Sequence, residues 1–268
     1  MAFPGAAASR AEADYAVLGA PLDASTSFQP GTRFGPRRIR TFAESFEDYD
    51  HHTDQHFSAL AVHDHGDVEP GADVAEYLQY LEGTIADFAA DGLFPLLVGG
   101  EHTVSVAAVR ALEPDVFVCL DAHLDLRESL RGDPLSHATV TRHALAVADE
   151  AVVLGARAGS EAEWARAAES DVTVVPPAAV PDWKPDLDGR RAYLSVDVDA
   201  ADPGFAPGTG TREPFGLDPA TMRDVVRAVA PAAVGADVVE VNDRDDGQAP
   251  TLAAKLLRAV VFAHAAER

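Results

Sequence analysis

The stretch VFVCLDAHLD, residues 116–125, places a run of apolar, β-favouring residues directly before alternating acidic and imidazole side chains. On a β-strand, the side chains at positions i, i+2 and i+4 project from one face. Asp121, His123 and Asp125 therefore converge if the chain stays extended beyond the apolar run. The stretch predicts a strand with a group of polar side chains at its carboxyl end.

Two further segments repeat this arrangement. AYLSVDVD, residues 192–199, brings Asp197 and Asp199 to one face in the same way, and PLLVGGEHT, residues 95–103, places His102 after another apolar run. The five acidic and His residues of the first two segments are already too many for one structural metal, and His102 is a sixth candidate. The set favours two divalent ions that share bridging carboxylates and activate a water between them.

A structural interpretation of each residue has to be weighed against this one. An Asp at the end of a strand is often only the N-cap of the next helix. A single His such as His102 is more often a structural residue than a metal ligand. Neither explanation accounts for the whole set, because one helix needs one cap and the polar residues recur after three separate apolar runs.

The order of apolar runs and amphipathic stretches indicates the fold class. Strand-like runs alternate with helical stretches, which predicts a parallel sheet with helices on both faces. The strands are continuously apolar, as expected for a sheet buried on both sides. We therefore predict a three-layer α/β/α fold with a central, mostly parallel sheet. The expected strands are Tyr15–Leu18, Leu60–Val62, Leu96–Val98, Val116–Leu120, Val152–Leu154, Val172–Val175, Tyr193–Val196 and Val238–Val241, and the expected helices are Val74–Ala90, Val104–Leu112, Thr139–Val147, Glu161–Ala168, Pro219–Val229 and Thr251–Ala265.

Three long loops are expected to surround the site. Ligands of parallel sheets bind at the carboxyl ends of the strands, where the polar clusters lie. Residues 22–38, 124–136 and 200–217 are rich in Gly, Pro and charge. Loops of this length in a compact domain are usually functional, so we expect them to form the rim of an active site.

The composition excludes some partners. The chain has 44 acidic and 21 basic residues and a formal charge of −23, so it would repel the phosphates of nucleic acid. Such acidity can steer a cationic substrate. Rare Lys and acid spread along the whole chain fit halophilic adaptation better, since strong salt would screen any steering. The one cysteine, Cys119, excludes an internal disulfide and is expected to be a small core residue.

The length and the hydropathy bound the domain organisation. A chain of 268 residues with 47% hydrophobic residues suits one large α/β domain. We expect residues 1–13 to form a loose tail and residues 14–268 a single domain. No apolar run approaches 18 residues and nothing resembles a signal peptide, so we expect a cytoplasmic protein without membrane contact.

At this point the motifs resemble a known family. GGEHT (99–103), LDAHLDLR (120–127) and SVDVDAADPGFAPGTGT (195–211) are similar to the three metal-site signatures of the ureohydrolases, the arginase and agmatinase family. GAPLD (19–23) through PGTRFGPRRIR (30–40) resembles the N-terminal loop in its agmatinase form. Further family positions match at Ser136-His137-Ala138 and at Val239-Glu240-Val241-Asn242, and the resemblance covers about residues 14 to 262. It implies an arginase-like fold.

The resemblance also implies a ligand set. Asp121 and Asp197 would bridge two metals, His102 and Asp125 would complete one site, and His123 and Asp199 the other. Carboxylate and imidazole donors without thiolate favour two Mn²⁺ over Zn²⁺, and Ni²⁺ or Co²⁺ stays open. The residues implied in the reaction are His137, Asp125 and Glu240.

His137 and Glu240 each have a structural alternative. His137 can be a histidine at a helix start; the family's role for it is general acid or proton shuttle, for which its usual pKa is suitable. Glu240 can be a salt-bridged structural acid; the family's role for it is to hydrogen-bond the substrate guanidinium, which would compensate its burial.

The leading functional hypothesis is hydrolysis of a small cationic guanidino compound, agmatine, to putrescine and urea. Arginine, guanidinobutyrate and formiminoglutamate stay open because Arg127 or Arg131 can bind a carboxylate if not paired with Glu128 or Asp133. A Zn-dependent deacetylase of related fold and a non-catalytic relative are the alternatives from other classes. The resemblance further implies a homo-oligomer, a trimer or hexamer.

Overall fold

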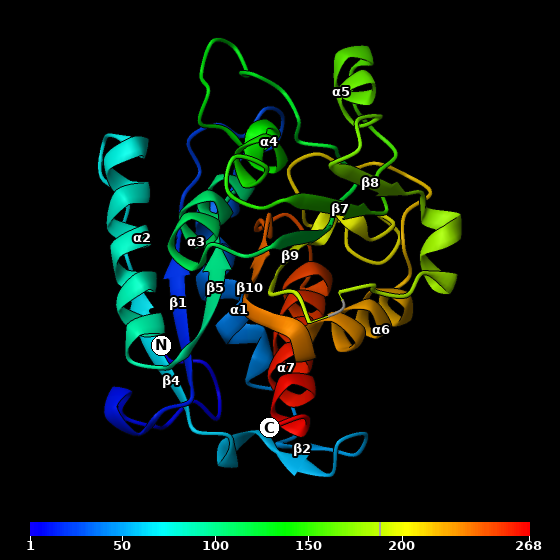
Figure 1. Ribbon diagram of the computed structural model, residues 1–268. Helices are drawn as coiled ribbons and strands as arrows, with labels where there is room; N and C mark the ends of the chain where they lie inside the picture. The colour runs from blue at the N-terminus through cyan, green and yellow to red at the C-terminus, as the bar shows by residue number, and fades with distance from the viewer. Residues whose placement is uncertain (188) are drawn as a thin grey trace.

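One parallel β-sheet runs through the middle of the molecule (Figure 1). The computed structural model describes residues 1–187 and 189–268, and within them the sheet has eight strands in the order β4-β1-β5-β10-β9-β6-β7-β8. Every pairing in it is parallel. The strands are β1 (Tyr15–Ala20), β4 (Val62–Asp67), β5 (Phe94–Gly99), β6 (Val116–Leu120), β7 (Glu150–Leu154), β8 (Val172–Val175), β9 (Ala192–Asp197) and β10 (Ala233–Val239), with β2 (Tyr49–Asp50) and β3 (Gln55–His56) forming a separate antiparallel pair.

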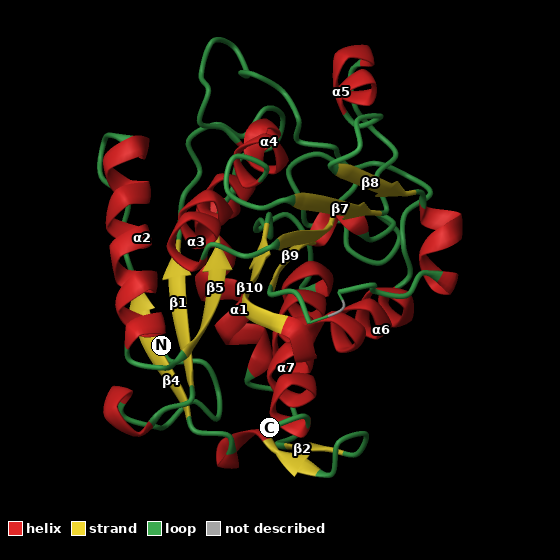
Figure 2. Cartoon of the chain, in the orientation of Figure 1, coloured by secondary structure: helices red, strands yellow, loops and turns green. Residues whose placement is uncertain are grey.

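Helices cover both faces of this sheet (Figure 2). On one face α1 and α6 both contact α7, which packs on β10; on the other face α2 packs against α3 and α3 against α4. The predicted three-layer α/β/α class is confirmed. The helices are α1 (Gly35–Ala43), α2 (Val74–Ala90), α3 (Ser105–Leu112), α4 (Val140–Ala144), α5 (Glu161–Arg166), α6 (Pro219–Val229) and α7 (Gln248–Ala266).

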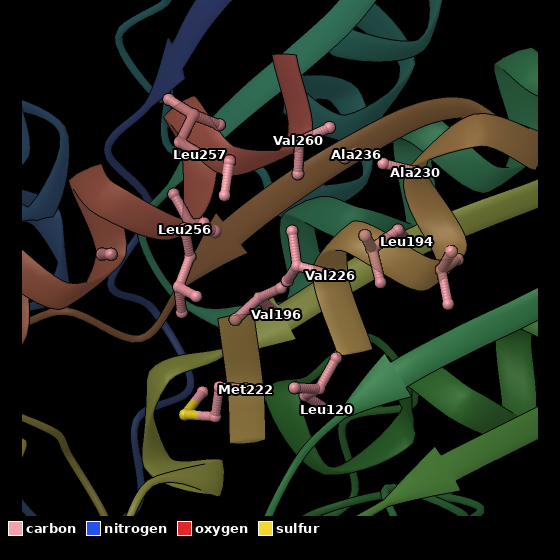
Figure 3. Close-up of a cluster of buried hydrophobic side chains, with 14 of the residues drawn as sticks. Leu120, Leu194, Val196, Met222, Val226, Ala230, Ala236, Leu256, Leu257 and Val260 are labelled. Carbon is pink, nitrogen blue, oxygen red and sulfur yellow. The ribbon is translucent and has the colours of Figure 1, made fainter. Parts of the chain in front are cut away.

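Helix α6 shows how local sequence and packing agree. Asp218 caps its first turn by accepting hydrogen bonds from the backbone N–H groups of Ala220 and Thr221 at 2.9 and 3.0 Å. Its buried face then packs on the sheet: Figure 3 shows Met222 and Val226 beside strand residues such as Val196. This continuous apolar contact makes the central strands rigid where they carry the site.

Helix α1 was not expected, because residues 22–38 were predicted to form a loop. Gly35 and Pro36 start this helix, and a proline fits the first turn because its missing N–H would have no partner there. Ile39, Arg40 and Ala43 are buried, so the helix packs on the sheet. The prediction was misled by the many Gly, Pro and Arg residues, which here mark a helix start and its charged surface.

The start of the chain also contacts the domain. Phe3 is 1% exposed and its ring lies 5.7 Å from that of Phe57. The division between a tail of residues 1–13 and a domain of residues 14–268 stays a prediction. Among the described residues no helix is long and apolar enough to span a bilayer.

Candidate metal centre and active site

The predicted site residues lie at the carboxyl ends of four neighbouring strands. β5, β10, β9 and β6 are adjacent in the sheet. His102, Glu240, Asp197 and Asp121 follow or end these strands in the same order. Residues that are far apart in the sequence therefore meet at one edge, the usual position of ligand sites in parallel sheets.

His102 is at the centre of the first ligand group. Its Nδ1 atom lies 3.0 Å from Asp125 Oδ2, 3.1 Å from Asp121 Oδ2 and 3.7 Å from Asp197 Oδ2. The residue is fully buried, and this Nδ1 atom has no hydrogen-bond partner in the described part of the chain. An imidazole nitrogen facing three carboxylates is an arrangement that a divalent cation would stabilise.

His123 forms the second group. Its Nδ1 atom lies 3.0 Å from Asp199 Oδ2 and 3.6 Å from Asp121 Oδ1. Asp121 thus directs one oxygen toward His102 and the other toward His123. This is the geometry of a bridging carboxylate between two ions.

The convergence does not come from an extended strand, as the sequence pattern suggested. β6 ends at Leu120, and Asp125 has a positive φ of 50°. Asp121 turns the chain by accepting a hydrogen bond from the backbone N–H of His123 at 2.7 Å. Asp197 does the same with Asp199 at 2.8 Å. The period-two pattern reflects these tight Asx-type turns, in which a short carboxylate bonds to the backbone two residues on.

The electrostatics show how unfavourable this cluster is without a cation. Burial, and then the charge of Asp121, raise the pKa of Asp125 to about 7. Burial, and then Asp199 and Asp121, raise the pKa of Asp197 well above its usual value. Burial opposes ionisation of Asp121 too, but the nearby imidazoles of His102 and His123 hold its pKa below the usual range.

The other face of His102 is supported by groups that sequence reasoning missed. Its Nε2 atom lies 3.0 Å from Ser195 Oγ, which donates to Asp237 Oδ1 at 2.7 Å. Tyr193 also donates to this buried aspartate, at 2.7 Å. Asp237 lies inside the apolar strand β10 and directly before the expected strand Val238–Val241, so a charged residue next to an apolar run was the available signal. Partners of this kind orient a ligating imidazole.

Cys119 remains a core residue, as predicted. It is fully buried, and its Sγ atom lies 3.8 Å from His102 Nε2 and 3.9 Å from Asp121 Oδ2. Burial raises the pKa of this thiol to about 12. A neutral thiol is a poor metal ligand, so the carboxylates and imidazoles are the better candidate donors.

Glu240 lies just beyond its strand instead of within it. β10 ends at Val239, and Glu240 adopts a positive φ of 64°. A non-glycine residue in this region costs about 1–3 kcal/mol, and such strain is concentrated at functional sites. The turn directs the carboxylate back to the cluster, where Oε1 accepts the backbone N–H of His102 at 2.8 Å. Burial first, and then repulsion from Glu101, raise the pKa of Glu240 well above its usual value.

His137 lines a cleft beside the cluster of expected metal ligands. This cleft has a volume of about 450 Å³, and His123, Asp125 and His137 contribute to its lining. Ser25 Oγ lies 3.0 Å from His137 Nδ1 and Ser27 Oγ lies 3.2 Å from Nε2. Sequence reasoning expected the 22–38 loop near the site but did not identify the two serines, because contacts between distant loops leave no local pattern.

Charged residues form the outer wall of the cleft. Arg127 pairs with Glu163, with Nε and Oε2 3.1 Å apart, and Arg131 donates to the carbonyl oxygen of Ser27 at 3.3 Å. Glu128 and Asp133, the partners considered from the sequence, do not take part in these two contacts. Glu163 and Glu213 both line the cleft.

Comparison with known proteins assigns this geometry to a family. The arginase family model matches residues 13–263. The chain belongs to the arginase family. An agmatinase of Bacillus anthracis is 35% identical, covering 94% of this chain and 92% of its own length. A guanidinobutyrase of Pseudomonas aeruginosa is 34% identical, covering 91% of this chain and 84% of its own. The agmatine ureohydrolase structure of Thermoplasma volcanium superposes with a TM-score of 0.93 at 33% identity, covering 99% of this chain and 94% of that one.

Arginase-family enzymes hydrolyse guanidino compounds at a binuclear metal site, and this chain has candidate residues for one. Two groups of the described residues have donor atoms close enough together to hold an ion, Asp121–His123–Asp199 and His102–Cys119–Asp121. The unpartnered Nδ1 of His102, together with the raised pKa of Asp125, fits a site built to receive cations.

Proposed function

We propose that this protein hydrolyses agmatine to putrescine and urea, with two Mn²⁺ ions as cofactors. The single observation that carries the proposal is that the imidazole–carboxylate cluster opens, through His123 and Asp125, onto a cleft whose wall also carries Glu163 and Glu213. His102, Asp121, His123, Asp125, Asp197 and Asp199 would hold the ions. When bound, two divalent ions supply an activated water beside the guanidinium carbon.

The protein groups around the cluster suit each part of this reaction. One oxygen of Glu240 is engaged by the backbone of His102, and the other is available to hydrogen-bond and orient the guanidinium. Asp125 lines the cleft together with His123, so its carboxylate is placed to accept a proton from the water. The reaction adds water to the guanidinium carbon, breaks its bond to the substituted nitrogen and leaves that nitrogen as an amine. His137 would deliver the proton that this nitrogen needs.

Agmatine is favoured over arginine by the charges of the cleft wall. Arg127 is paired with Glu163 and Arg131 with a backbone carbonyl, so both are engaged already. Glu213 lines the cleft, and the described residues contain no ion pair to its carboxylate. An unpaired acid suits the distal ammonium of agmatine. It would repel the α-carboxylate of arginine.

The test is a side-by-side rate measurement on the Mn²⁺-loaded enzyme. Urea release is scored with agmatine, arginine and guanidinobutyrate, and glutamate release with formiminoglutamate. We expect agmatine to exceed arginine in kcat/KM by at least about 100-fold, because an unpaired buried carboxylate costs a few kcal/mol. Glu213→Gln should reduce this preference, whereas Arg131→Ala should keep it. Faster turnover of arginine or guanidinobutyrate in the parent enzyme would refute agmatine as the substrate and leave the family assignment intact.

We also propose that the chain forms homo-oligomers. A groove of about 890 Å³ between α6 and α7 contains Phe205, which is 48% exposed, together with Arg223 and Lys255. Aromatic side chains and arginines are enriched at subunit contacts. Sedimentation of the purified protein at several concentrations tests this, and Phe205→Glu should dissociate the assembly if the groove is the contact.

A further inference from the structure

The loop after β1 lies directly against the segment that carries His102. Gly100 makes this contact possible, because a Cβ at this position would lie 2.2 Å from the carbonyl oxygen of Leu22. The backbones are joined there by the N–H of Glu101, which donates to Leu22 at 2.8 Å. As a result, Ser25 lies beside Glu101, although the two are 76 residues apart in the sequence.

Glu101 is a fully buried carboxylate that accepts four hydrogen bonds. Two come from the backbone N–H groups of Ala24 and Ser25, at 2.6 and 2.7 Å. The other two come from hydroxyls, Ser25 Oγ at 2.7 Å and Thr103 Oγ1 at 2.6 Å. The four donors fix the carboxylate and, through it, the position of the loop.

Ser25 connects this carboxylate to His137. The Ser25 Oγ atom accepts the backbone N–H of His137 at 3.0 Å and also lies 3.0 Å from the Nδ1 atom of its ring. A hydroxyl has one hydrogen and two acceptor lone pairs. If that hydrogen pointed at Nδ1, two oxygens 2.7 Å apart, on Ser25 and Glu101, would face each other without a proton between them.

The charged acceptor therefore takes the hydroxyl hydrogen, and the remaining lone pair of Ser25 requires a donor at Nδ1. Nε2 is then the unprotonated nitrogen of the neutral ring. Burial lowers the pKa of His137. The charge of Glu101 opposes this shift and the charge of His123 adds to it, and the lowered pKa agrees with a neutral ring at rest.

We propose that Glu101 and Ser25 are positioning residues that hold His137 in the tautomer with its hydrogen on Nδ1, so that Nε2 is the atom that takes up and releases the proton. This inference rests on the proposed role of His137 in the hydrolysis. During turnover a proton would bind to Nε2 and then pass to the nitrogen of the leaving amine. The Nδ1–H bond stays intact throughout.

This arrangement lowers the reorganisation that proton transfer requires. Ser25 accepts from Nδ1–H in both the neutral and the cationic ring, so its hydroxyl does not have to rotate; only the hydroxyl of Ser27, whose Oγ lies 3.2 Å from Nε2, changes partner when that nitrogen is protonated. The buried negative charge of Glu101 stabilises the imidazolium across the intervening hydroxyl. The same division of roles, an acid that orients and a histidine that moves the proton, operates in acid–histidine pairs of other hydrolases.

A double-mutant cycle tests the proposal on the Mn²⁺-loaded enzyme. Ser25→Ala should lower kcat by about 10–100-fold, the usual cost of losing a partner that orients an imidazole. KM and the metal content should stay at parental values, the thermal midpoint should fall equally in both backgrounds because Glu101 loses one of its four donors, and Ser25→Thr should restore most of kcat. In a His137→Ala background, whose own kcat should fall by about 10²–10⁴-fold, Ser25→Ala should have no further effect on kcat.

Thr26→Val is the matched control in the same loop, since its hydroxyl bonds to Asp23 at 2.9 Å instead of to His137. Any effect that it has should be the same in both backgrounds. An equal loss of kcat from Ser25→Ala in both backgrounds, or no loss in the parent, would overturn the proposal. A parental kcat in His137→Ala alone would instead refute the proposed role of the histidine itself.

Discussion

Two regions of this molecule bury carboxylates, and they compensate the charge in opposite ways. Arg40 of α1 is 2% exposed and binds Asp64 through two hydrogen bonds, at 2.7 and 2.8 Å. Its remaining nitrogen bonds to Asp67. In the metal centre, four aspartates and Glu240 surround only two imidazoles. The first region contains an arginine that balances its carboxylates, whereas the second has more carboxylates than imidazoles and would be completed by added cations.

The pKa directions express this difference. Burial alone would raise the pKa of Asp64, but the hydrogen bonds and charge of Arg40 hold it below the usual value. Burial and the neighbouring carboxylates raise the pKa of Asp125 and Asp197, and the nearby imidazoles offset this only in part. An ion pair whose charges balance within the chain contributes to the stability of the fold and to nothing else. A cluster with excess carboxylates lowers the stability of the metal-free fold and raises its affinity for metal.

The largest effect is expected when the carboxylate of Asp121, which faces both ligand groups, is removed. Asp121→Asn should abolish urea release and reduce metal content from about two ions per chain toward zero, because Asp121 faces both histidines. Asp199→Asn should retain one ion, because Asp199 lies near His123 alone among the two imidazoles. Metal analysis of the loaded, dialysed proteins distinguishes the two. Equal loss in both variants would contradict the bridging geometry.

The next effect concerns the internal ion pair. Arg40→Met should lower the free energy of unfolding by about 3–5 kcal/mol, because it leaves the buried Asp64 carboxylate without a charged partner. Denaturant unfolding measures the loss, and Arg40→Met combined with Asp64→Leu should recover much of it.

A matched control is Arg190→Met, which breaks a partly exposed pair with Glu150. It should cost at most about 1 kcal/mol. The number of bound metal ions should not change in any of these variants. A stability loss in Arg40→Met no larger than in Arg190→Met would show that the buried pair has no special role.

The smallest effect is a pH dependence of the metal-free protein. Asp125 has a folded pKa of about 7 against a usual value of 3.8, so the folded state binds more protons between these values and stability falls as pH rises across them. His123 acts in the same direction: burial lowers its pKa, but Asp199 and Asp121 raise it to about 12, and its contribution is lost as pH rises from 6.5 toward that value.

Denaturation midpoints in chelator at pH 5 and pH 7.5 measure this slope. Asp125→Asn should flatten it, and Mn²⁺ should reverse it, because metal binds the deprotonated ligands that high pH favours. A midpoint of the metal-free protein that rises from pH 5 to pH 7.5 would contradict the description of the cluster as one with excess carboxylates.

The features of this molecule that depend on interactions within one segment were predicted from the sequence, and those that depend on contacts between distant segments were not. α2 and α6 have the predicted bounds, because caps and periodicity are local. The six expected metal ligands are close together, because each follows an apolar run that forms a strand. The predicted extended geometry was wrong at Asp125 and the predicted strand end was wrong at Glu240, since both residues adopt positive φ values that only the surrounding contacts stabilise.

The sequence by itself determined which side chains lie at the ends of which strands, because hydrophobic period and strand length are properties of short segments. Only the tertiary structure decided that β10 lies between β5 and β9, and hence that Glu240 reaches the backbone of His102 across 138 residues. It also decided that Ser25 reaches His137 across 112 residues. These contacts depend on strand order and on the close approach of two backbones at Gly100, and no pattern within one segment encodes a distance to another.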